Sequence, residues 1–400
     1  MPTQIELKML QALPLEVKIQ KTRMRIQEFV EEYGEDGVYA SFSGGKDSTV
    51  LLHILRQMYP DLPAVFADTG LEYPAIRQFV RQYQNVIWVK PEMTFKEVVT
   101  QFGYPVIGKE VASYVWVARH SKDGPYKQGR LERLMGTSRR KDGNLSIYNR
   151  PKYGFLLDAP FELSDICCRE MKKKPMNQYG RLTGKHPLMA TMAEESQLRK
   201  GKWLKSGCNS FQGKKPNSTP MAFWLEQDVL RYLYQYHDAI LDAITVDYQN
   251  REVLESEENS ISKKLIHPWA SCYGEIYPFR TKNEVIGQMY IHEAIRAYEG
   301  CKFSTSKCKR TGCIFCLFGI TQDRDRILKV QEEEPKIADY VLRGGFFNET
   351  GMWRPDNRGL GFWFVIQWLN VHGRLGIIFD GGDDYAERYG NEQTRKLLLR

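Results

Sequence analysis

The chain has 400 residues, 42% hydrophobic and 26% charged, which are the proportions of an ordinary globular protein and exclude a largely disordered one. Its start lacks the basic segment and apolar core of a signal peptide, and no apolar run approaches the roughly 18 residues of a membrane span. We therefore expect a cytoplasmic protein with no membrane association. Eight cysteines in such a chain indicate buried thiols, ligands or catalysts rather than disulfides.

The formal net charge of +8 is concentrated in two stretches, residues 119–152 and 169–215. The first carries ten Lys and Arg against three acidic residues, and the second carries twelve against three. Such concentrated charge indicates a polyanionic partner, either nucleotide phosphates or a nucleic-acid backbone. A solvated basic face is the alternative interpretation.

The first quarter of the chain alternates helices and strands. An apolar stripe over residues 19–33 predicts an amphipathic helix that ends at Gly34. The following predicted elements are strands at 38–42, 63–67 and 86–89, a helix over 50–58, and helices beginning near Pro74 and Thr94. This alternation with short connections predicts an α/β fold, in which a parallel twisted sheet has helices on both faces.

The later chain is less regular. Residues 120–149 are polar, basic and rich in glycine, which predicts a long active-site loop or an insertion. A helix is predicted from Thr219-Pro220 to Leu233, and a polar surface loop over 251–264. The predicted organisation is an N-terminal helical segment 1–35, a nucleotide-binding domain 36–235, and a smaller, mainly helical, cysteine-bearing C-terminal region 236–400.

A phosphate-binding loop, Ser43-Gly44-Gly45-Lys46-Asp47-Ser48, follows the first predicted strand. Glycines at this place let backbone N–H groups approach an anion, and the next helix adds its positive N-terminal end. The serine hydroxyls can donate hydrogen bonds, Lys46 can neutralise charge, and Asp47 can hold the Mg²⁺ that accompanies a polyphosphate. The spacing is not that of a Walker loop, and a glycine-rich turn without function is the alternative.

A second polar motif, Asp68-Thr69-Gly70, follows the next predicted strand. Open α/β sheets bind ligands at the carboxyl ends of their strands. An Asp-Thr-Gly alone is a common turn. Together with the phosphate loop, it predicts a carboxylate and a hydroxyl near a bound nucleotide.

In this order and spacing the motifs resemble the phosphoadenosine phosphosulfate (PAPS) reductase superfamily of PP-loop ATP pyrophosphatases. The matching segments are Ser41–Ser48, Phe66–Pro74, Cys167–Lys172, Glu195-Ser196 with Arg199, Pro220 with Trp224 and Asp228, and Thr311–Cys316. The resemblance implies an adenine nucleotide alpha hydrolase-like fold, with Lys46, Asp47 and Asp68 as catalytic residues. It also implies ATP binding by Ser41, Ser43, Gly44, Gly45, Lys46, Asp47, Ser48, Asp68, Thr69, Gly70, Glu195, Ser196 and Arg199.

Members of this superfamily differ in chemistry. Sulfonucleotide reductases usually depart from the Ser-Gly-Gly-x-Asp-Ser loop and attack with a cysteine on a C-terminal tail. Here the loop is intact, and the 84 residues after Cys316 contain no cysteine. Both departures favour chemistry on ATP, as in the similar sulfurtransferases of DNA phosphorothioation.

We therefore expect an ATP pyrophosphatase-type sulfurtransferase or a related nucleotidyl enzyme. Its expected partners are ATP with Mg²⁺, a nucleic-acid acceptor and a sulfur donor protein such as a cysteine desulfurase. A sulfonucleotide reductase is the first alternative. A nucleotide-sensing regulatory or DNA-binding module without turnover is the second.

Cys313 and Cys316 have the C-x-x-C spacing at which one turn presents two thiolates to a metal centre. Cys167 and Cys168 are adjacent, which is unusual for residues that only pack. The resemblance implies that these two pairs hold a 4Fe–4S cluster. A four-cysteine zinc site is the main alternative, because thiolates suit either metal, and unligated thiols are a third possibility.

Three further cysteines bear on this assignment. Cys301 and Cys308 lie close enough in sequence to Cys313 to be rival ligands. Cys208 is a candidate persulfide carrier, but a buried structural thiol is the favoured interpretation, since cysteine is among the most buried residue types.

Overall fold

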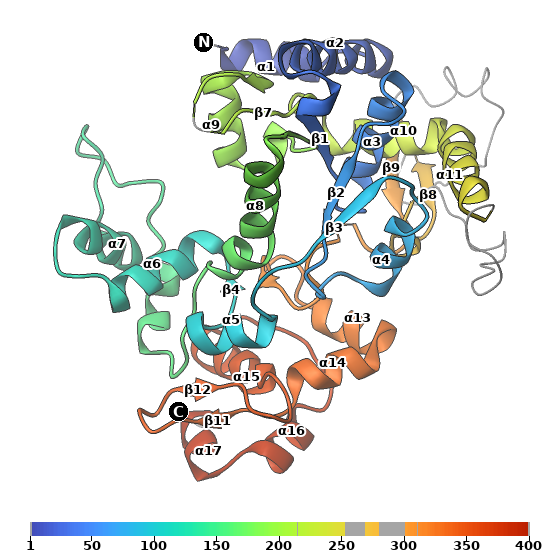
Figure 1. The fold of residues 1–400 in the computed structure, drawn as a ribbon. Helices are drawn as coiled ribbons and strands as arrows, with labels where there is room; N and C mark the ends of the chain where they lie inside the picture. The colour runs from blue at the N-terminus through green and yellow to red at the C-terminus, as the bar shows by residue number, and fades with distance from the viewer. Residues whose placement is uncertain (1, 214, 253–268, 280–300, 310, 399–400) are drawn as a thin grey trace. The chain divides into compact units, whose positions relative to one another are not determined.

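The structure is a computed structural model that describes residues 2–213, 215–252, 269–279, 301–309 and 311–398 (Figure 1). The chain forms two compact units, each built from separate stretches of sequence. The first comprises Met1–Asp68, Glu72–Lys90 and Pro175–Gly312, and the second comprises Thr69–Leu71, Pro91–Lys174 and Cys313–Arg400. The surface loop expected at residues 251–264 falls almost wholly outside the described residues.

The first unit is organised around a six-stranded sheet of order β3-β2-β1-β5-β7-β6. Its strands are β1 (Val38–Ser41), β2 (Ala64–Ala67), β3 (Val86–Val89), β5 (His186–Met189), β6 (Asn209–Ser210) and β7 (Asn217–Ser218). Neighbouring strands pair in parallel, except that β6 and β7 are antiparallel. The predicted parallel sheet, with helices on both faces, is confirmed apart from the antiparallel strand β6.

Sequence explains why the central strands lie inside the sheet. The first three residues of β1 and of β2 are all buried. Continuous apolar runs of this kind are typical of parallel strands that are covered on both faces. The helices of the first unit are α1 (Gln4–Gln11), α2 (Leu15–Tyr33), α3 (Lys46–Met58), α4 (Pro74–Val80), α8 (Lys174–Thr183), α9 (Gln197–Ser206), α10 (Glu226–Gln235) and α11 (His237–Glu252).

One predicted helix begins later than expected. The segment from Thr219 forms turns, in which the N–H of Ala222 donates to the carbonyl of Thr219, and α10 begins only at Glu226. The reason is tertiary packing. Trp224 is fully buried, and its indole N–H donates to the hydroxyl of Thr22 in α2 at 2.9 Å. The strands β8 (Ile276–Phe279) and β9 (Lys302–Thr305) pair antiparallel in this unit.

The second unit is mainly helical and has its own core. Its helices are α5 (Phe95–Phe102), α6 (Lys109–His120), α7 (Pro125–Met135), α13 (Arg326–Glu333), α14 (Pro335–Leu342), α15 (Phe362–Gly373), α16 (Gly382–Tyr389) and α17 (Glu392–Leu398). Two short sheets pair β4 (Val106–Ile107) with β10 (Leu317–Phe318) in parallel, and β11 (Phe346–Phe347) with β12 (Trp353–Arg354) antiparallel. The first five residues of α15 are buried, which places this helix in the core of the unit.

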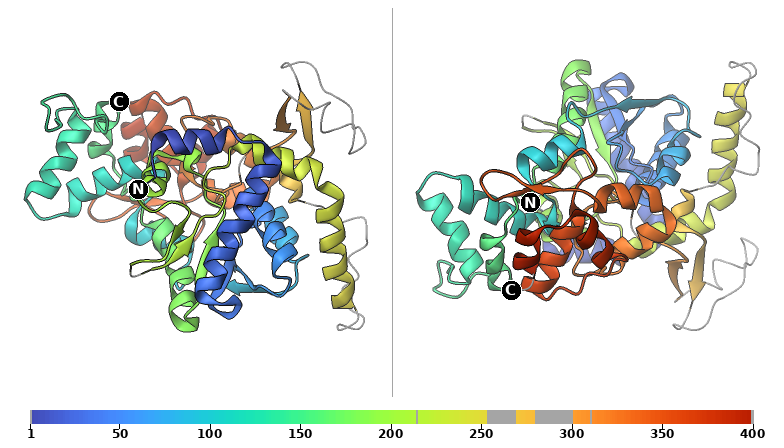
Figure 2. Two further views of the ribbon diagram at one scale, coloured as in Figure 1. Left: turned by 90° about the horizontal axis from the view of Figure 1, so that it is seen from above. Right: turned by 90° about the horizontal axis from the view of Figure 1, so that it is seen from below.

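The basic segment 120–149 is not simply a loop. It contains the helix α7, which packs beside α6 (Figure 2) and ends at Gly136 in the left-handed conformation. A short hairpin follows, in which Arg139 pairs with Leu145. None of the described helices is both long enough and apolar enough to cross a bilayer.

Candidate nucleotide site and cysteine site

The phosphate loop connects the end of β1 at Ser41 to the first residue of α3, Lys46. Gly44 has a φ of +68°, and a Cβ at this position would come within 2.7 Å of Val80 and 2.9 Å of Ile76. Both the backbone conformation and the close approach of α4 therefore require glycine here. Ser41 itself pairs with Val65 of β2, so the loop starts from the middle of the sheet.

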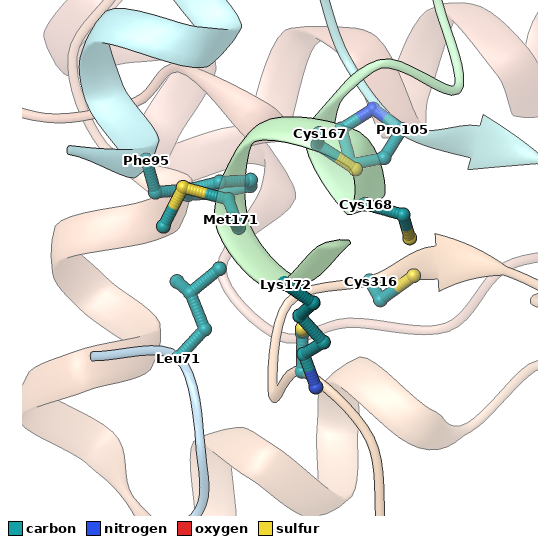
Figure 3. A pocket seen from close by; sticks show the side chains of 9 residues that line it. Leu71, Phe95, Pro105, Cys167, Cys168, Met171, Lys172 and Cys316 are labelled. Carbon is teal, nitrogen blue, oxygen red and sulfur yellow. The ribbon is translucent and has the colours of Figure 1, made fainter. Parts of the chain in front are cut away.

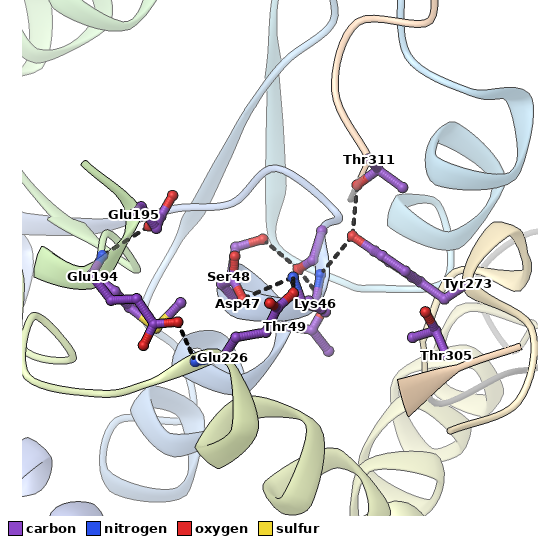
Figure 4. A network of polar contacts seen from close by, with 12 residues as sticks. Lys46, Asp47, Ser48, Thr49, Glu194, Glu195, Glu226, Tyr273, Thr305 and Thr311 are labelled. Atoms are coloured by element: carbon purple, nitrogen blue, oxygen red, sulfur yellow. Dashed lines mark hydrogen bonds and ion pairs between the residues drawn. The ribbon is translucent and has the colours of Figure 1, made fainter. Parts of the chain in front are cut away.

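Hydrogen bonds within the loop fix its shape (Figure 4). The N–H of Ser43 donates to the Ser48 hydroxyl at 3.2 Å, and the two hydroxyls lie 2.9 Å apart. The Ser48 hydroxyl also lies 2.9 Å from the carbonyl of Gly45, to which it can donate. Ser48 therefore closes the loop from the first turn of α3, and the backbone of the loop is held before any ligand binds.

Charged side chains surround the start of α3. The ammonium of Lys46 is buried and lies 3.5 Å from Oδ1 of Asp47 and 3.3 Å from Oε1 of Glu226 (Figure 4). Burial raises the pKa of Asp47, Lys46 opposes that effect, and Glu195 adds to it. Oδ1 of Asp47 is buried and, apart from its ion pair with Lys46, has no polar partner among the described residues. This buried, partly compensated carboxylate is suited to a cation.

Tyr273 covers the same helix end. Its hydroxyl accepts a hydrogen bond from the backbone N–H of Lys46 at 3.1 Å and lies 2.6 Å from Oγ1 of Thr311 (Figure 4). The Tyr273 side chain is buried, and burial raises the pKa of its phenol well above its usual range. A neutral hydroxyl thus occupies a hydrogen-bonding position that a phosphate oxygen takes at helix N-termini.

Asp68 follows β2, the strand next to β1. Its N–H donates to the carbonyl of Val89, and Arg77 donates to its Oδ2 at 3.0 Å. Oδ1 of Asp68 is buried without a hydrogen-bond partner among the described residues. Because neighbouring parallel strands end at one edge of a sheet, Asp68 and the phosphate loop lie on that same edge, as the sequence predicted. Thr69 and Gly70 belong to the second unit and form a turn, in which the N–H of Leu71 donates to the hydroxyl of Thr69.

The predicted residues Glu195, Ser196 and Arg199 form the start of α9. The Ser196 hydroxyl accepts from the N–H of Arg199 at 3.3 Å, which makes it the N-cap of the helix. Arg199 forms an ion pair with Glu195. Glu195 also contributes to the raised pKa of Asp47, so its charge reaches the phosphate loop.

The two predicted cysteine pairs line one cavity in the second unit (Figure 3). Cys168 directly precedes the π-helical turn Arg169–Lys173, and Cys316 directly precedes β10. The N–H of Cys316 donates to the carbonyl of Cys313, which forms the turn expected of a C-x-x-C. The remaining lining residues are Leu71, Phe95, Pro105, Met171 and Lys172.

The four thiols influence one another electrostatically. A hydrogen bond with Cys167 lowers the pKa of Cys168 to about 6, and Lys109 and Lys172 lower it further against burial. The same hydrogen bond, with burial, raises the pKa of Cys167. Burial raises the pKa of Cys316 to about 11, and Cys313 adds to this. One thiolate therefore forms readily in this cavity, and each further thiolate requires a compensating positive charge.

Within the described ranges, no three His, Cys, Asp or Glu side chains are grouped so that they could hold a single metal ion. The four cysteines share a cavity without that close grouping. The rival Cys308 is engaged elsewhere, because its thiol donates to the carbonyl of Cys272 in the first unit. Cys208 is buried, as predicted for a structural thiol.

Sequence reasoning missed three contributors to these sites. Tyr273 and Glu226 carry no motif, and they reach the phosphate loop only through tertiary packing. Lys109 lies in α6, which is distant in sequence from every cysteine pair, and acts on Cys168. The only sequence signal was their residue type, which is too common to identify a site.

Comparisons with known proteins bear on this geometry. The sequence model of a family described as the phosphoadenosine phosphosulfate reductase domain matches residues 37–128, which include the phosphate loop and Asp68. The adenosine 5'-phosphosulfate reductase of Geobacillus kaustophilus is 36% identical over 78 residues, 18% of this chain and 33% of that protein. The reductase of the same name from Bacillus cereus is 34% identical over 73 residues, 17% and 31% of the two chains.

The chain therefore spans about a third of the length of these relatives. A solved structure of phosphoadenylyl-sulfate (PAPS) reductase from Candida auris, in complex with phosphate, overlaps 66% of this chain and 98% of that chain. Its TM-score is 0.31 and its identity 14%, so the overlap is distant. Residues 37–128, which carry the phosphate loop and Asp68, thus match the phosphoadenosine phosphosulfate reductase domain, and the related sequences support kinship with that superfamily through this segment.

Proposed function

We propose that the protein binds ATP with Mg²⁺ at the phosphate loop and splits it into AMP and pyrophosphate during sulfur transfer to an acceptor. In this reaction an acceptor oxygen attacks the α-phosphorus and displaces pyrophosphate. A persulfide sulfur on a donor protein such as a cysteine desulfurase then attacks the adenylated centre and displaces AMP. A thiol reductant cleaves the S–S bond that still joins this sulfur to the donor, so the sulfur remains on the acceptor. The observation that supports ATP most directly is the intact, internally bonded loop, with the buried Asp47 oxygen beside it.

Each residue of the loop has a role in this proposal. The backbone N–H of Lys46 and the N-terminal end of α3 bind phosphate oxygens. The Lys46 ammonium stabilises negative charge that builds on the leaving pyrophosphate. Mg²⁺, when bound, would be held by Asp47 with the phosphates and would neutralise the same charge. Asp68 supplies a second buried carboxylate oxygen at the same edge of the sheet.

The cysteine cavity fits a 4Fe–4S cluster in its donor set. Cys167, Cys168, Cys313 and Cys316 would hold the cluster, whose positive irons would compensate the thiolates that the apolar lining disfavours. Such a cluster supplies electron transfer or binding of a sulfur atom. Lys109 and Lys172 stabilise the thiolate of Cys168 independently of the cluster.

A sulfonucleotide reductase is the second candidate function. The observation that favours it is the similarity to two adenosine 5'-phosphosulfate reductases over the segment that carries the loop. The match of residues 37–128 to the phosphoadenosine phosphosulfate reductase domain supports a sulfonucleotide-related function in general. The intact phosphate loop argues against the reductase, because it is suited to a diphosphate leaving group, which sulfonucleotides do not carry.

Competition binding distinguishes the two functions. Mg²⁺–ATP should displace a fluorescent ATP analogue more strongly than adenosine phosphosulfate or its 3'-phosphorylated form, and incubation with ATP should release pyrophosphate. If a sulfonucleotide binds more tightly and yields sulfite with an added thiol, the reductase function is the correct one.

The variant Asp47→Asn should keep the fold and lose pyrophosphate release, since a metal-bound carboxylate contributes several kcal/mol, roughly 3–4, to transition-state stabilisation. Asp383→Asn, on the exposed first turn of α16, is the matched control and should release pyrophosphate normally. Unchanged turnover in Asp47→Asn would remove this residue from the site.

A further inference from the structure

Aromatic rings and guanidinium groups alternate along the contact between α6 and α7. The guanidinium of Arg130 lies 5.0 Å from the ring centre of Tyr114 and 5.1 Å from that of Tyr126. The guanidinium of Arg133 lies 5.5 Å from the ring centres of both Tyr114 and Tyr148. These five side chains form a ladder in the order Tyr126, Arg130, Tyr114, Arg133, Tyr148, and we call it the Tyr–Arg ladder.

The middle and the ends of the ladder differ in exposure. Tyr114 is buried, whereas Tyr126 is 61% exposed and Tyr148 is 42% exposed. Packing explains the centre, because Arg133 also donates to the Tyr114 hydroxyl and so joins α7 to α6. Each end ring lies against one guanidinium and presents its remaining surface to solvent. Large aromatic rings left in water at both ends of one ladder indicate a surface that binds something.

The surroundings of the ladder define the chemistry of its ligand. Residues 119–152, from the end of α6 through α7 and the hairpin after it, carry ten basic against three acidic side chains, a net charge of +7. Of these, Arg139, Arg140 and Lys141 are exposed on the hairpin that follows α7. Ile147, next to Tyr148, is 69% exposed, so apolar surface accompanies the positive charge.

We propose that the Tyr–Arg ladder and the basic hairpin after α7 bind single-stranded nucleic acid. Bases stack on exposed aromatic rings and on guanidinium planes, and cationic side chains nearby hold the phosphate backbone. Tyr126 and Tyr148 would each accept a base, and Arg139 and Lys141 would contact phosphates. A duplex would offer its phosphates but not its base faces. An acidic protein would bind through the positive charge alone and would leave the exposed rings without a role.

This surface lies in the second unit and requires no nucleotide chemistry. It would give the acceptor class of the proposed function if that function holds. The binding experiment contains no ATP, so its result is separate from that of the pyrophosphate assay.

The experiment measures fluorescence anisotropy of labelled 20-nucleotide single strands, DNA and RNA of one sequence, titrated with the full chain at several salt concentrations. Tyr126→Ala and Tyr148→Ala should each raise Kd about tenfold, while Tyr126→Phe and Tyr148→Phe should change it little. Tyr340→Ala, a comparably exposed tyrosine on α14, is the matched control. Lys141→Ala should reduce the salt dependence, and Lys336→Ala should not.

The DNA and RNA arms show which strand is preferred, and either preference supports the proposal. Equal binding of duplex DNA or poly-glutamate, with no loss in the tyrosine-to-alanine variants, would overturn it in favour of a purely electrostatic surface. Absence of binding at low salt would also overturn it. Because the tested tyrosines are exposed, circular dichroism should show an unchanged fold in each variant.

Discussion

Tyr273→Phe tests whether the phosphate loop is capped by its own chain before nucleotide binds. The change removes the hydroxyl that accepts the Lys46 N–H at 3.1 Å and contacts Thr311 at 2.6 Å, and it leaves the ring in place. A buried donor that loses its partner costs about 1–3 kcal/mol. The unliganded variant should therefore be destabilised by about 2 kcal/mol relative to the parent protein.

Bound phosphate would supply the missing acceptor in the variant, so the cost should disappear when the site is filled. The affinity of the variant for Mg²⁺–ATP should then rise by up to about 30-fold, which is the equivalent of 2 kcal/mol. Isothermal titration calorimetry gives the affinity. Urea unfolding with and without saturating Mg²⁺–ATP gives the two stabilities, whose difference between variant and parent should shrink when ATP is present.

Tyr104→Phe provides the control. Tyr104 is equally buried and donates a hydroxyl hydrogen bond to the carbonyl of Leu360 at 2.8 Å within the second unit. Its loss should destabilise the protein and leave ATP affinity unchanged. If Tyr273→Phe instead binds ATP equally or more weakly than the parent, the hydroxyl does not compete with phosphate, and the reasoning is refuted.

Protein purified without oxygen should be brown with about four irons per chain, and Cys316→Ser should bleach it while Cys301→Ser should not; stoichiometric zinc without iron would contradict this. Burial lowers the pKa of His53 to about 4, below its unfolded value of 6.5, so the unfolded state takes up the proton first. The unfolding free energy should therefore fall by up to about 3 kcal/mol from pH 6.5 to 4, measured by urea titration, and a pH-independent value would refute the assignment. Lys18→Met should destabilise the fold by about 3–5 kcal/mol, because it leaves the carboxylate of Asp228, 2.6 Å from the Lys18 ammonium, without its counter-charge. Adding Asp228→Asn should recover part of that loss in the same unfolding assay.

The elements of the N-terminal sheet could be predicted because their signals are local. Gly34 ends α2, Pro74 begins α4, and Thr94 caps α5 through a capping box with Glu97. Each of these effects acts within one helical turn, so the sequence alone contains the information. The parallel pairing of β1 and β2 follows from the helix between them.

The remaining features depend on tertiary contacts. The helix α7 has one buried residue, Leu134, so its apolar pattern is too weak to be recognised. Tyr273 reaches Lys46 across 227 positions of the chain, and no local pattern marks such a pair. The interleaving of two units from separate stretches is likewise a property of long-range contacts. The pair Cys313 and Cys316 was predicted from its spacing, and its association with Cys167 and Cys168 from the resemblance; the cavity that all four line required the fold.

The order of strands in the first unit has a consequence for synthesis of the protein. The strand β1, which leads into the phosphate loop, pairs with β5, whose first residue lies 145 positions after the last residue of β1. At a translation rate of about 5–20 residues per second, β1 must wait on the order of ten seconds for this partner to emerge. During that interval one edge of β1 is exposed, and its buried residues Val38, Tyr39 and Ala40 are open to pairing with other chains. Ribosome-bound chains that end before β5 should therefore recruit chaperones strongly, and chains that extend past β7 should release them.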